Sequence, residues 1–381
     1  MSPWRLLAAA LLLGALMPAS AADTGRRLVI YDQDTDGIIG DNTDPLVMLL
    51  QAPDIQVLGV TVVTGNGWLK QETATVLKLL EDLRRTDIPV YMGAEFPLVQ
   101  SRYTPVRLLK LYGGNRTDPY LGAYGEFSPG PDEVAPPPGG LAHYRPAAEP
   151  AALFIIQQLH QHPHQVTLYC GGALTNVALA IRLDPDIVAL TREIVFMGTS
   201  PELQPKTVNV VYDPESASIV LHAPWPKLTL ITVDVAEKLH KTPAMAAAIA
   251  HGRNTAEAQL YEELVMKPYR AHEPQQWFRM PDELMAAYLI DPSLITEWRR
   301  FYVDVDLNMG MNYAASSYWD EFPKEYGGGS WPAKPGQKAQ KPTAPPDARV
   351  ANVAWDFDTG RFTELFLRLM TAPMSPAPSS R

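Results

Sequence analysis

The chain has 381 residues, of which 46% are hydrophobic and 19% are charged, and its formal net charge is −10. This composition is that of a globular protein with a sizeable core. The acidic balance excludes nucleic acid as the expected partner, because binding to phosphates needs a basic surface. A single cysteine, Cys170, excludes an internal disulfide, and we expect a buried, inert thiol at the end of an apolar strand.

The first 21 residues have the layout of a secretory signal peptide. Arg5 precedes an apolar run over residues 6–17, and the small-residue sequence ASA at 19–21 resembles a cleavage site. The apolar run is shorter than the roughly 20 residues that a membrane-spanning helix needs. We therefore expect no membrane span and an exported protein, periplasmic or secreted. N-terminal sequencing of the mature protein, which should start at or near Ala22, tests this expectation.

Strand-like and helix-like segments alternate along the chain. Short apolar or β-branched runs predict strands, and apolar residues at helical spacing predict helices. The predicted strands cover residues 28–31, 57–63, 90–91, 166–170, 194–197 and 228–233. The predicted helices cover residues 76–85, 151–160 and 177–182. Thr175 or Asn176 is expected to cap the last of these helices.

This alternation predicts an α/β fold with a mostly parallel central sheet that is covered on both faces. We expect one Rossmann-like domain over residues 22–371 and a disordered tail over residues 372–381. Segments 128–146 and 327–349 are rich in proline and glycine, so they are expected to be loops, either lids or solvated insertions. In such sheets, ligands bind beyond the carboxyl ends of the strands, so we expect the active site there.

Polar residues follow three of the predicted strands, and the most acidic group comes first. Five aspartates lie within or just before the loop after the first strand, at Asp32, Asp34, Asp36, Asp41 and Asp44. Like charges this close repel one another unless a cation or protons neutralise them. Oxygen-only ligands suit calcium or magnesium rather than zinc. A solvated acidic turn is the alternative, but a position directly after a buried strand favours a cation site.

Several segments, in order along the chain, resemble the inosine–uridine-preferring nucleoside hydrolase family. The family's opening strand and DxDxxxDD loop resemble YDQDTDGIIGDNTDPLVMLL, and its glycine–asparagine turn resembles TVVTGNGW. Later family motifs resemble GGALTNVALAIR, REIVFMG, NVVYDPESASIVL, MPDELMAAYLIDPSL and WDFDTGRFTELFLRL. The resemblance covers residues 27–369. It implies a calcium-dependent enzyme that hydrolyses the N-glycosidic bond of ribonucleosides and releases ribose and a free base.

The resemblance also implies roles for six residues whose surrounding motifs are kept. Three groups correspond to the family's calcium ligands, one to a neighbouring carboxylate, and two to asparagines that hold the ribose hydroxyls. These are, in that order, Asp34, Asp282 and the Gly171 carbonyl; Asp32; and Asn66 with Asn209.

The middle of the acidic loop departs from the family pattern. The family has two adjacent aspartates there, one a general base toward water and the other a calcium ligand. Here the loop is longer, and Asp41 is followed by Asn42. We expect Asp41 to be the base and Asp44 to be the ligand. Asn42 in the ligand position, and Asp36 in either role, are the alternatives.

A second departure concerns the leaving group. Many purine-cleaving relatives have a histidine just before the late calcium aspartate, and it can protonate the departing base; here this position is Pro281. His272 is the nearest histidine in sequence, and we expect it to be an ordinary surface residue. Trp277 and Phe278 are candidates to stack on the base. We therefore expect catalysis to depend on ribose activation and base stacking rather than on proton delivery.

Two other functions are compatible with parts of the sequence. The first is an exported nucleoside- or sugar-binding protein without turnover, because function belongs to the site rather than to the fold and the acidic loop is altered. The second is a haloacid-dehalogenase-type phosphatase with Asp32 as nucleophile and magnesium, although its later lysine and acidic pair are missing. The expected partner is a small-molecule nucleoside, and a homo-oligomer is possible.

Overall fold

The computed structural model describes residues 25–112, 122–130, 132–203, 205–273, 279–320 and 349–376. The predicted signal peptide, Trp277, Phe278 and most of the predicted loop 327–349 lie outside these residues. Among the helices in the described ranges, none is long and apolar enough to cross a membrane.

A nine-stranded sheet forms the centre of the described structure, in the order β3-β2-β1-β4-β5-β6-β9-β7-β8. Neighbouring strands from β3 to β9 in this order are parallel, whereas β7 is antiparallel to both β9 and β8. The strand bounds are β1 Arg27–Gln33, β2 Ile55–Val62, β3 Val90–Met92, β4 Val166–Cys170, β5 Glu193–Met197, β6 Leu228–Ile231, β7 Ile295–Val305, β8 Ser316–Asp320 and β9 Val350–Phe357. The predicted α/β fold with a mostly parallel central sheet is confirmed.

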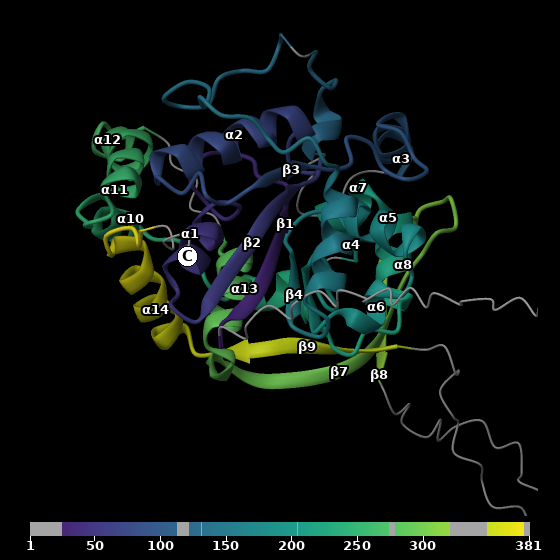
Figure 1. Cartoon of the computed structure of the whole chain (residues 1–381). Coiled ribbons are helices and arrows are strands. Elements are labelled where there is room, and N and C mark those ends of the chain that lie inside the picture. The colour runs from purple at the N-terminus through teal and green to yellow at the C-terminus, as the bar shows by residue number, and fades with distance from the viewer. Residues whose placement is uncertain are drawn as a thin grey trace, which may run out of the picture.

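Helices cover both faces of the sheet, so its strands are buried on each side (Figure 1). Alternate residues of β1 show this, because Val29 and Tyr31 pack into one core and Leu28 and Ile30 into the other. The first core contains α1 Asp44–Gln51, α2 Leu69–Asp82, α10 Pro243–Ala250, α11 Thr255–Tyr261, α13 Pro281–Ile290 and α14 Thr359–Thr371. The second contains α4 Ala151–Gln161, α5 Thr175–Leu183, α6 Ile187–Leu190 and α8 Pro214–His222.

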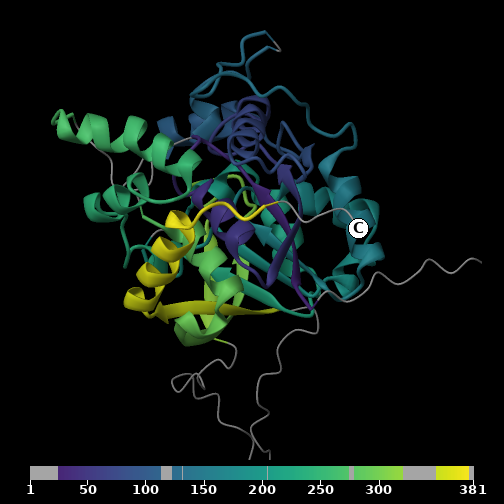
Figure 2. The same cartoon turned by 60° about the vertical axis from the view of Figure 1, so that its left-hand side comes forward.

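The remaining helical segments are short and connect these layers. They are α3 Tyr103–Tyr112, α7 Val208–Tyr212, α9 Val233–Ala236, α12 Lys267–Arg270, the 3-10 turns η1 Gly122–Gly125 and η3 Pro292–Leu294, and the π-helical turn η2 Glu262–Met266. Helices α10 to α12 form a group beside α1 and α14 (Figures 1 and 2). This group belongs to the long connection between β6 and α13, and it bears on the site described below.

The predicted loop 128–146 and the predicted tail both make defined contacts. In the loop, Gln71 of α2 donates to the Ala135 carbonyl at 2.8 Å, and the His143 amide donates to Glu81 of the same helix at 2.8 Å. These bonds favour a packed insertion over a free lid. The tail begins with ordered chain, because Gln51 donates to the Ala372 carbonyl at 2.9 Å; residues 377–381 lie outside the described ranges.

Candidate active site

The residues predicted to do chemistry meet at the carboxyl ends of the central strands. Asp32 near the end of β1 lies level with Thr61 of β2 and Cys170 of β4. The segments that follow these strands carry Asp34, Asn66 and Gly171, and they therefore leave the sheet at the same edge. The order of the parallel strands is therefore sufficient to bring these three residues together at one edge of the sheet.

Asp34 is completely buried and lies close against two glycines. Its Oδ2 accepts a hydrogen bond from the Asn66 backbone amide at 2.8 Å. A Cβ atom at Gly65 would lie 2.1 Å from Asp34 Oδ2, and one at Gly172 would lie 2.8 Å from the Asp34 amide nitrogen. Side chains at these two positions would therefore displace Asp34, which explains why glycine follows both neighbouring strands.

Asp282 reaches the same place from the start of α13. Pro281 occupies the first turn, where its missing amide hydrogen costs nothing, and the helix dipole favours an acidic residue there. The Oδ2 atom of Asp282 accepts hydrogen bonds from Gln33 at 2.8 Å and from Asn42 at 3.0 Å. The Tyr169 hydroxyl donates to the Asp282 carbonyl at 2.8 Å and fixes this end of the helix.

Each of these aspartates keeps one buried oxygen without a hydrogen-bond partner, at Oδ1 of Asp34 and Oδ1 of Asp282. Burial, and then the charges of Asp41 and Asp34, raise the pKa of Asp282 well above its usual value. Burial likewise raises the pKa of Asp34, and Asp41 and Asp36 raise it further. Two desolvated carboxylates that repel each other and leave oxygens unpaired are the arrangement that a bound cation stabilises.

Asp32 also has one buried oxygen without a partner, Oδ2, but two side-chain donors hold its other oxygen. Its Oδ1 accepts hydrogen bonds from Thr61 at 2.6 Å and from the Asn176 side chain at 2.8 Å. Burial raises the pKa of Asp32 to about 6, and these two donors oppose the rise. The predicted capping role of Asn176 is wrong, because α5 begins without a side-chain cap and Asn176 is used to bind Asp32. Thr175 is also no cap, because its hydroxyl donates to Asp213 at 2.7 Å.

Asp41 and Asp36, the two candidates for the base, are placed differently. Asp36 is exposed, whereas Asp41 is half-buried near Asp34 and Asp282, whose pKa values its charge raises. Burial raises the pKa of Asp41 to about 6, although the nearby positive charge of Lys241 opposes this. A carboxylate with such a pKa is ionised near neutral pH and accepts a proton more readily than an ordinary aspartate.

Asp44 has hydrogen-bond partners different from those of Asp34 and Asp282. Its Oδ1 accepts the Gly40 amide at 3.2 Å, and its Oδ2 is bound by the Lys241 ammonium group and the Tyr261 hydroxyl. Burial lowers the pKa of Lys241, but Asp44, Tyr261 and Glu283 raise it well above its usual value, so the lysine is charged. The structure thus gives Asp44 a protein cation as partner. Asn42, the sequence alternative, is the loop residue that contacts Asp282.

The two predicted ribose-binding asparagines have different partners. Asn66 donates from its side chain to Asn42 Oδ1 at 3.2 Å. Asn209 of α7 donates to the Gly171 carbonyl at 2.6 Å and to the Met197 carbonyl at 2.8 Å. Asn209 therefore contacts the carbonyl that was predicted as a metal ligand, and it links the ends of β4 and β5.

The oxygen donors present fit a hard cation. Asp34 and Asp282 supply unpaired carboxylate oxygens. Asn42 Oδ1 and the Gly171 carbonyl are further oxygen atoms of the site, and each accepts a hydrogen bond, from Asn66 and from Asn209 respectively. Across the described part of the chain, however, no three His, Cys, Asp or Glu side chains form a group that is suited to a metal ion.

Three residues that bind the aspartates of this site were not predicted from the sequence to do so. Gln33 lies between the two aspartates of the DxD sequence, and it donates to Asp282 while its Oε1 accepts the Asp34 amide at 3.1 Å. Asn176 and Lys241 bind Asp32 and Asp44, respectively. Only Gln33 and Asn176 carry a signal in sequence, because both lie inside matched motifs. Lys241 lies in no motif.

An aromatic cluster lies near the same end of the sheet. Trp68 and Tyr124 pack edge to face with ring centroids 6.4 Å apart, and Tyr124 stacks on Tyr212 at 4.7 Å. His272 is exposed, as predicted for an ordinary surface residue, and it follows α12.

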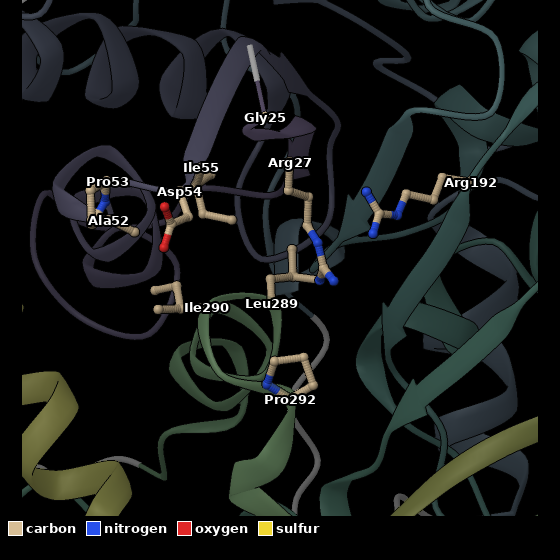
Figure 3. A pocket seen from close by; sticks show the side chains of 10 residues that line it. All are labelled: Gly25, Arg27, Ala52, Pro53, Asp54, Ile55, Arg192, Leu289, Ile290 and Pro292. Carbon is tan, nitrogen blue, oxygen red and sulfur yellow. The ribbon is translucent and has the colours of Figure 1, made fainter. Parts of the chain in front are cut away.

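A cavity of about 220 Å³ lies at the opposite edge of the sheet (Figure 3). It is bounded by Arg27 at the start of β1, Arg192 before β5 and Pro292 after α13. None of the residues predicted to act in catalysis lines it. We therefore place the active site at the carboxyl ends and not in this cavity.

Comparison with known proteins shows the family to which this chain belongs. The sequence profile of the inosine-uridine preferring nucleoside hydrolase family matches residues 29–364. The chain belongs to this family, whose members hydrolyse ribonucleosides to ribose and a free base and generally use a metal ion. It is accordingly a hydrolase, and the phosphatase alternative is wrong.

Relatives of known type share this family assignment. The chain is 29% identical over 263 residues to the inosine-uridine preferring nucleoside hydrolase of Leishmania major, covering 67% of this chain and 77% of the relative. It is 28% identical over 288 residues to the enzyme of that description from Crithidia fasciculata, covering 71% and 84%. It is 26% identical over 295 residues to the pyrimidine-specific ribonucleoside hydrolase RihB of Escherichia coli, covering 76% and 86%.

Solved structures agree with the fold. A plant nucleoside hydrolase, PpNRh1, superposes with a TM-score of 0.67 at 21% identity and covers 91% of this chain and 99% of its own. An inosine-guanosine nucleoside hydrolase superposes with a TM-score of 0.64 at 25% identity and covers 91% and 98%.

Proposed function

We propose that this enzyme cleaves ribonucleosides with a calcium ion held by Asp34, Asp282, the Gly171 carbonyl and Asn42. The observation that carries the proposal is the pair of buried, unpartnered carboxylate oxygens of Asp34 and Asp282 at the carboxyl ends of the strands. Calcium accepts six to eight oxygen ligands in flexible geometry, so amide and carbonyl oxygens can complete a site that has only two carboxylates. Asn42 replaces Asp44 in the ligand set because Asp44 is bound to Lys241.

The residues of the chain then have separate tasks in the displacement at the anomeric carbon. Asp41 removes a proton from the attacking water. Asn66 and Asn209 contact the ribose hydroxyls and favour a transition state with oxocarbenium-ion character. Asp32 keeps the end of β1 in place through Thr61 and Asn176. When bound, calcium would lower the pKa of a water molecule and anchor the ribose diol.

The proposal is tested by a reducing-sugar assay over purine and pyrimidine nucleosides, with and without a chelator. We expect free ribose from at least one nucleoside, loss of this activity with the chelator, and recovery when calcium is added back. Restoration by magnesium but not by calcium would contradict the choice of metal. Binding of nucleosides without release of ribose would support the binding-protein alternative instead.

The leaving group gives a prediction of its own. Since Pro281 cannot donate a proton and His272 is exposed, we expect no general acid at either position. A riboside with an activated leaving group, such as nitrophenyl riboside, should be cleaved much faster than inosine. His272→Ala should change kcat by less than about tenfold, or roughly 1.4 kcal/mol of barrier. Equal rates on both substrates, together with an inactive His272→Ala variant, would show that His272 is the acid.

A further inference from the structure

Lys241 is a buried cation that lies between the two segments of the chain that supply the acidic residues of the site. Its side chain is 11% exposed. The ammonium group binds Asp44 of the acidic loop, lies 3.2 Å from Glu283 of α13, and donates to the Tyr261 hydroxyl at 2.9 Å. Lys241 itself precedes α10, so it belongs to the connection between β6 and α13.

On one side, this contact closes the turn that carries the base. Asp44 receives the Gly40 amide at its Oδ1, while the amides of Thr43 and Asp44 donate to the Gly40 carbonyl at 3.1 and 2.8 Å. The closed turn of residues 40–44 contains Asp41 and Asn42. Since Lys241 and Tyr261 hold the other oxygen of Asp44, they fix this turn relative to α10 and α11.

On the other side, the contact reaches the start of α13. Glu283 directly follows Asp282 and is fully buried. Neither of its oxygens has a hydrogen-bond partner, so the ammonium group of Lys241 is the cation that compensates its charge. A buried carboxylate without such compensation is costly, and the helix start would shift to relieve it.

Glu257 is a third buried acidic group that interacts with Lys241. Glu257 of α11 is 1% exposed, and both of its oxygens lack hydrogen-bond partners. Its charge interacts with those of Asp44 and Lys241. Lys241 therefore contacts two buried carboxyl groups, Asp44 and Glu283, and interacts electrostatically with a third, Glu257.

We infer that Lys241 is a positioning residue that ties the turn 40–44 to α13 and so sets the spacing of Asp41, Asn42 and Asp282. The inference rests on the proposed function, because those three residues are its proposed base and calcium ligands. Lys241 touches neither substrate nor metal in this role. It acts through Asp44 and Glu283, which are neighbours in sequence of the residues that do.

The test measures calcium binding by calorimetry and steady-state kinetics in Lys241→Met. We expect the calcium dissociation constant to rise by about tenfold or more and kcat to fall by about 10- to 100-fold, as for other residues that orient metal ligands. At saturating calcium, KM for the nucleoside should change less than kcat, because Asn209 is bound to the Gly171 and Met197 carbonyls and not to the turn. Lys241→Arg, which keeps the charge, should recover most of the calcium affinity.

Lys227→Met is the matched control. Lys227 also lies near a buried glutamate and a tyrosine, since it is 3.0 Å from Glu193 and donates to the Tyr288 hydroxyl at 2.6 Å. That cluster lies at the start of β6, at the edge of the sheet away from the active site. Lys227→Met should lower the melting temperature but leave the calcium dissociation constant and kcat unchanged.

The outcomes separate this inference from the proposed function. A wild-type protein without calcium binding or turnover would overturn the proposed function, and hydrogen exchange of the calcium-free protein would still test the turn. There, Lys241→Met should speed exchange of the Gly40 amide, and unchanged exchange would overturn the inference. A folded Lys241→Met with wild-type calcium affinity and kcat would overturn it as well, as would equal losses in Lys227→Met. If Lys241→Met does not fold, Tyr261→Phe should show the same changes at smaller size.

Discussion

Replacing Asp282 by alanine is expected to abolish calcium binding and nearly all turnover. The variant loses one of the two proposed carboxylate ligands, each of which has a buried oxygen without a hydrogen-bond partner. Residues that merely orient a metal ligand typically contribute about 10- to 100-fold in affinity, so the loss of a ligand should exceed that range. Calorimetry with calcium and a ribose-release assay measure the two effects. A tight calcium complex in Asp282→Ala would contradict the proposed ligand set.

The melting temperature gives a second measurement that does not depend on activity. Calcium at about 100 times its dissociation constant should stabilise the wild-type fold by roughly 2.7 kcal/mol, because the ion binds only the folded chain. Asp282→Ala should show no such shift. In the absence of calcium, the variant also lacks the repulsion between Asp282 and its neighbours Asp41 and Asp34, and this effect by itself stabilises the fold.

Asp291→Ala is the control for this variant, because it lies at the other end of the same helix. Asp291 ends α13 and pairs with Arg361 at 2.7 Å, on the side of the sheet away from the site. The variant should lose some stability and keep both the calcium-induced shift and the turnover. Loss of calcium binding in Asp291→Ala would mean that the effect of Asp282→Ala comes from damage to the helix.

The sequence was sufficient to place most of the site because the site follows from strand order. Asp34, Asn66 and Gly171 each come after an apolar run, and the carboxyl ends of parallel strands share one edge. Local pattern alone therefore brings together residues that are more than 100 positions apart. Asp282 was located only through its motif, since the sequence predicts no strand directly before it and its helix reaches the site by packing against the sheet.

The sequence did not predict which residues bind the side chains of the acidic loop. Asp44 and Asn42 are two residues apart in a turn, and their spacing does not tell which one faces Asp282. That choice depends on Lys241, which is 197 positions from Asp44 and lies in no motif. Likewise, a polar residue at a helix start predicts a cap. Asn176 instead donates a hydrogen bond to the buried Asp32 and so compensates the desolvation of that carboxylate.

The antiparallel edge was also not predicted. Strand β7 has five consecutive exposed residues from Thr296 to Arg300. This stretch lacks the continuous apolar run that is typical of the central strands. It pairs with β9 through backbone hydrogen bonds, and β8 follows it at the edge. Antiparallel strands can expose one face to water and then need less apolar sequence than strands buried on both faces, so their pattern is weaker.

Asp41→Asn is expected to lower kcat by about two to four orders of magnitude while calcium binding is kept. The amide is close to the carboxylate in size, but it cannot accept the proton of the attacking water. The pH profile gives the matching signature. Burial raises the pKa of Asp41 to about 6, and the base works only when ionised, so kcat/KM of the wild type should fall as the pH drops through about 6 or below. A bound calcium ion would lower that midpoint and cannot raise it.

Asp36→Asn is the matched control, because it makes the same change in the same loop at an exposed carboxylate. It should keep kcat within about tenfold of the wild type, or roughly 1.4 kcal/mol of barrier, together with the acidic limb of the profile. Asp41→Asn should lose that limb, since the titrating group is gone. An active Asp41→Asn beside an inactive Asp36→Asn would move the base to Asp36. That result would require the loop to rearrange when substrate binds, because Asp36 is exposed whereas Asp41 is half-buried near Asp34 and Asp282.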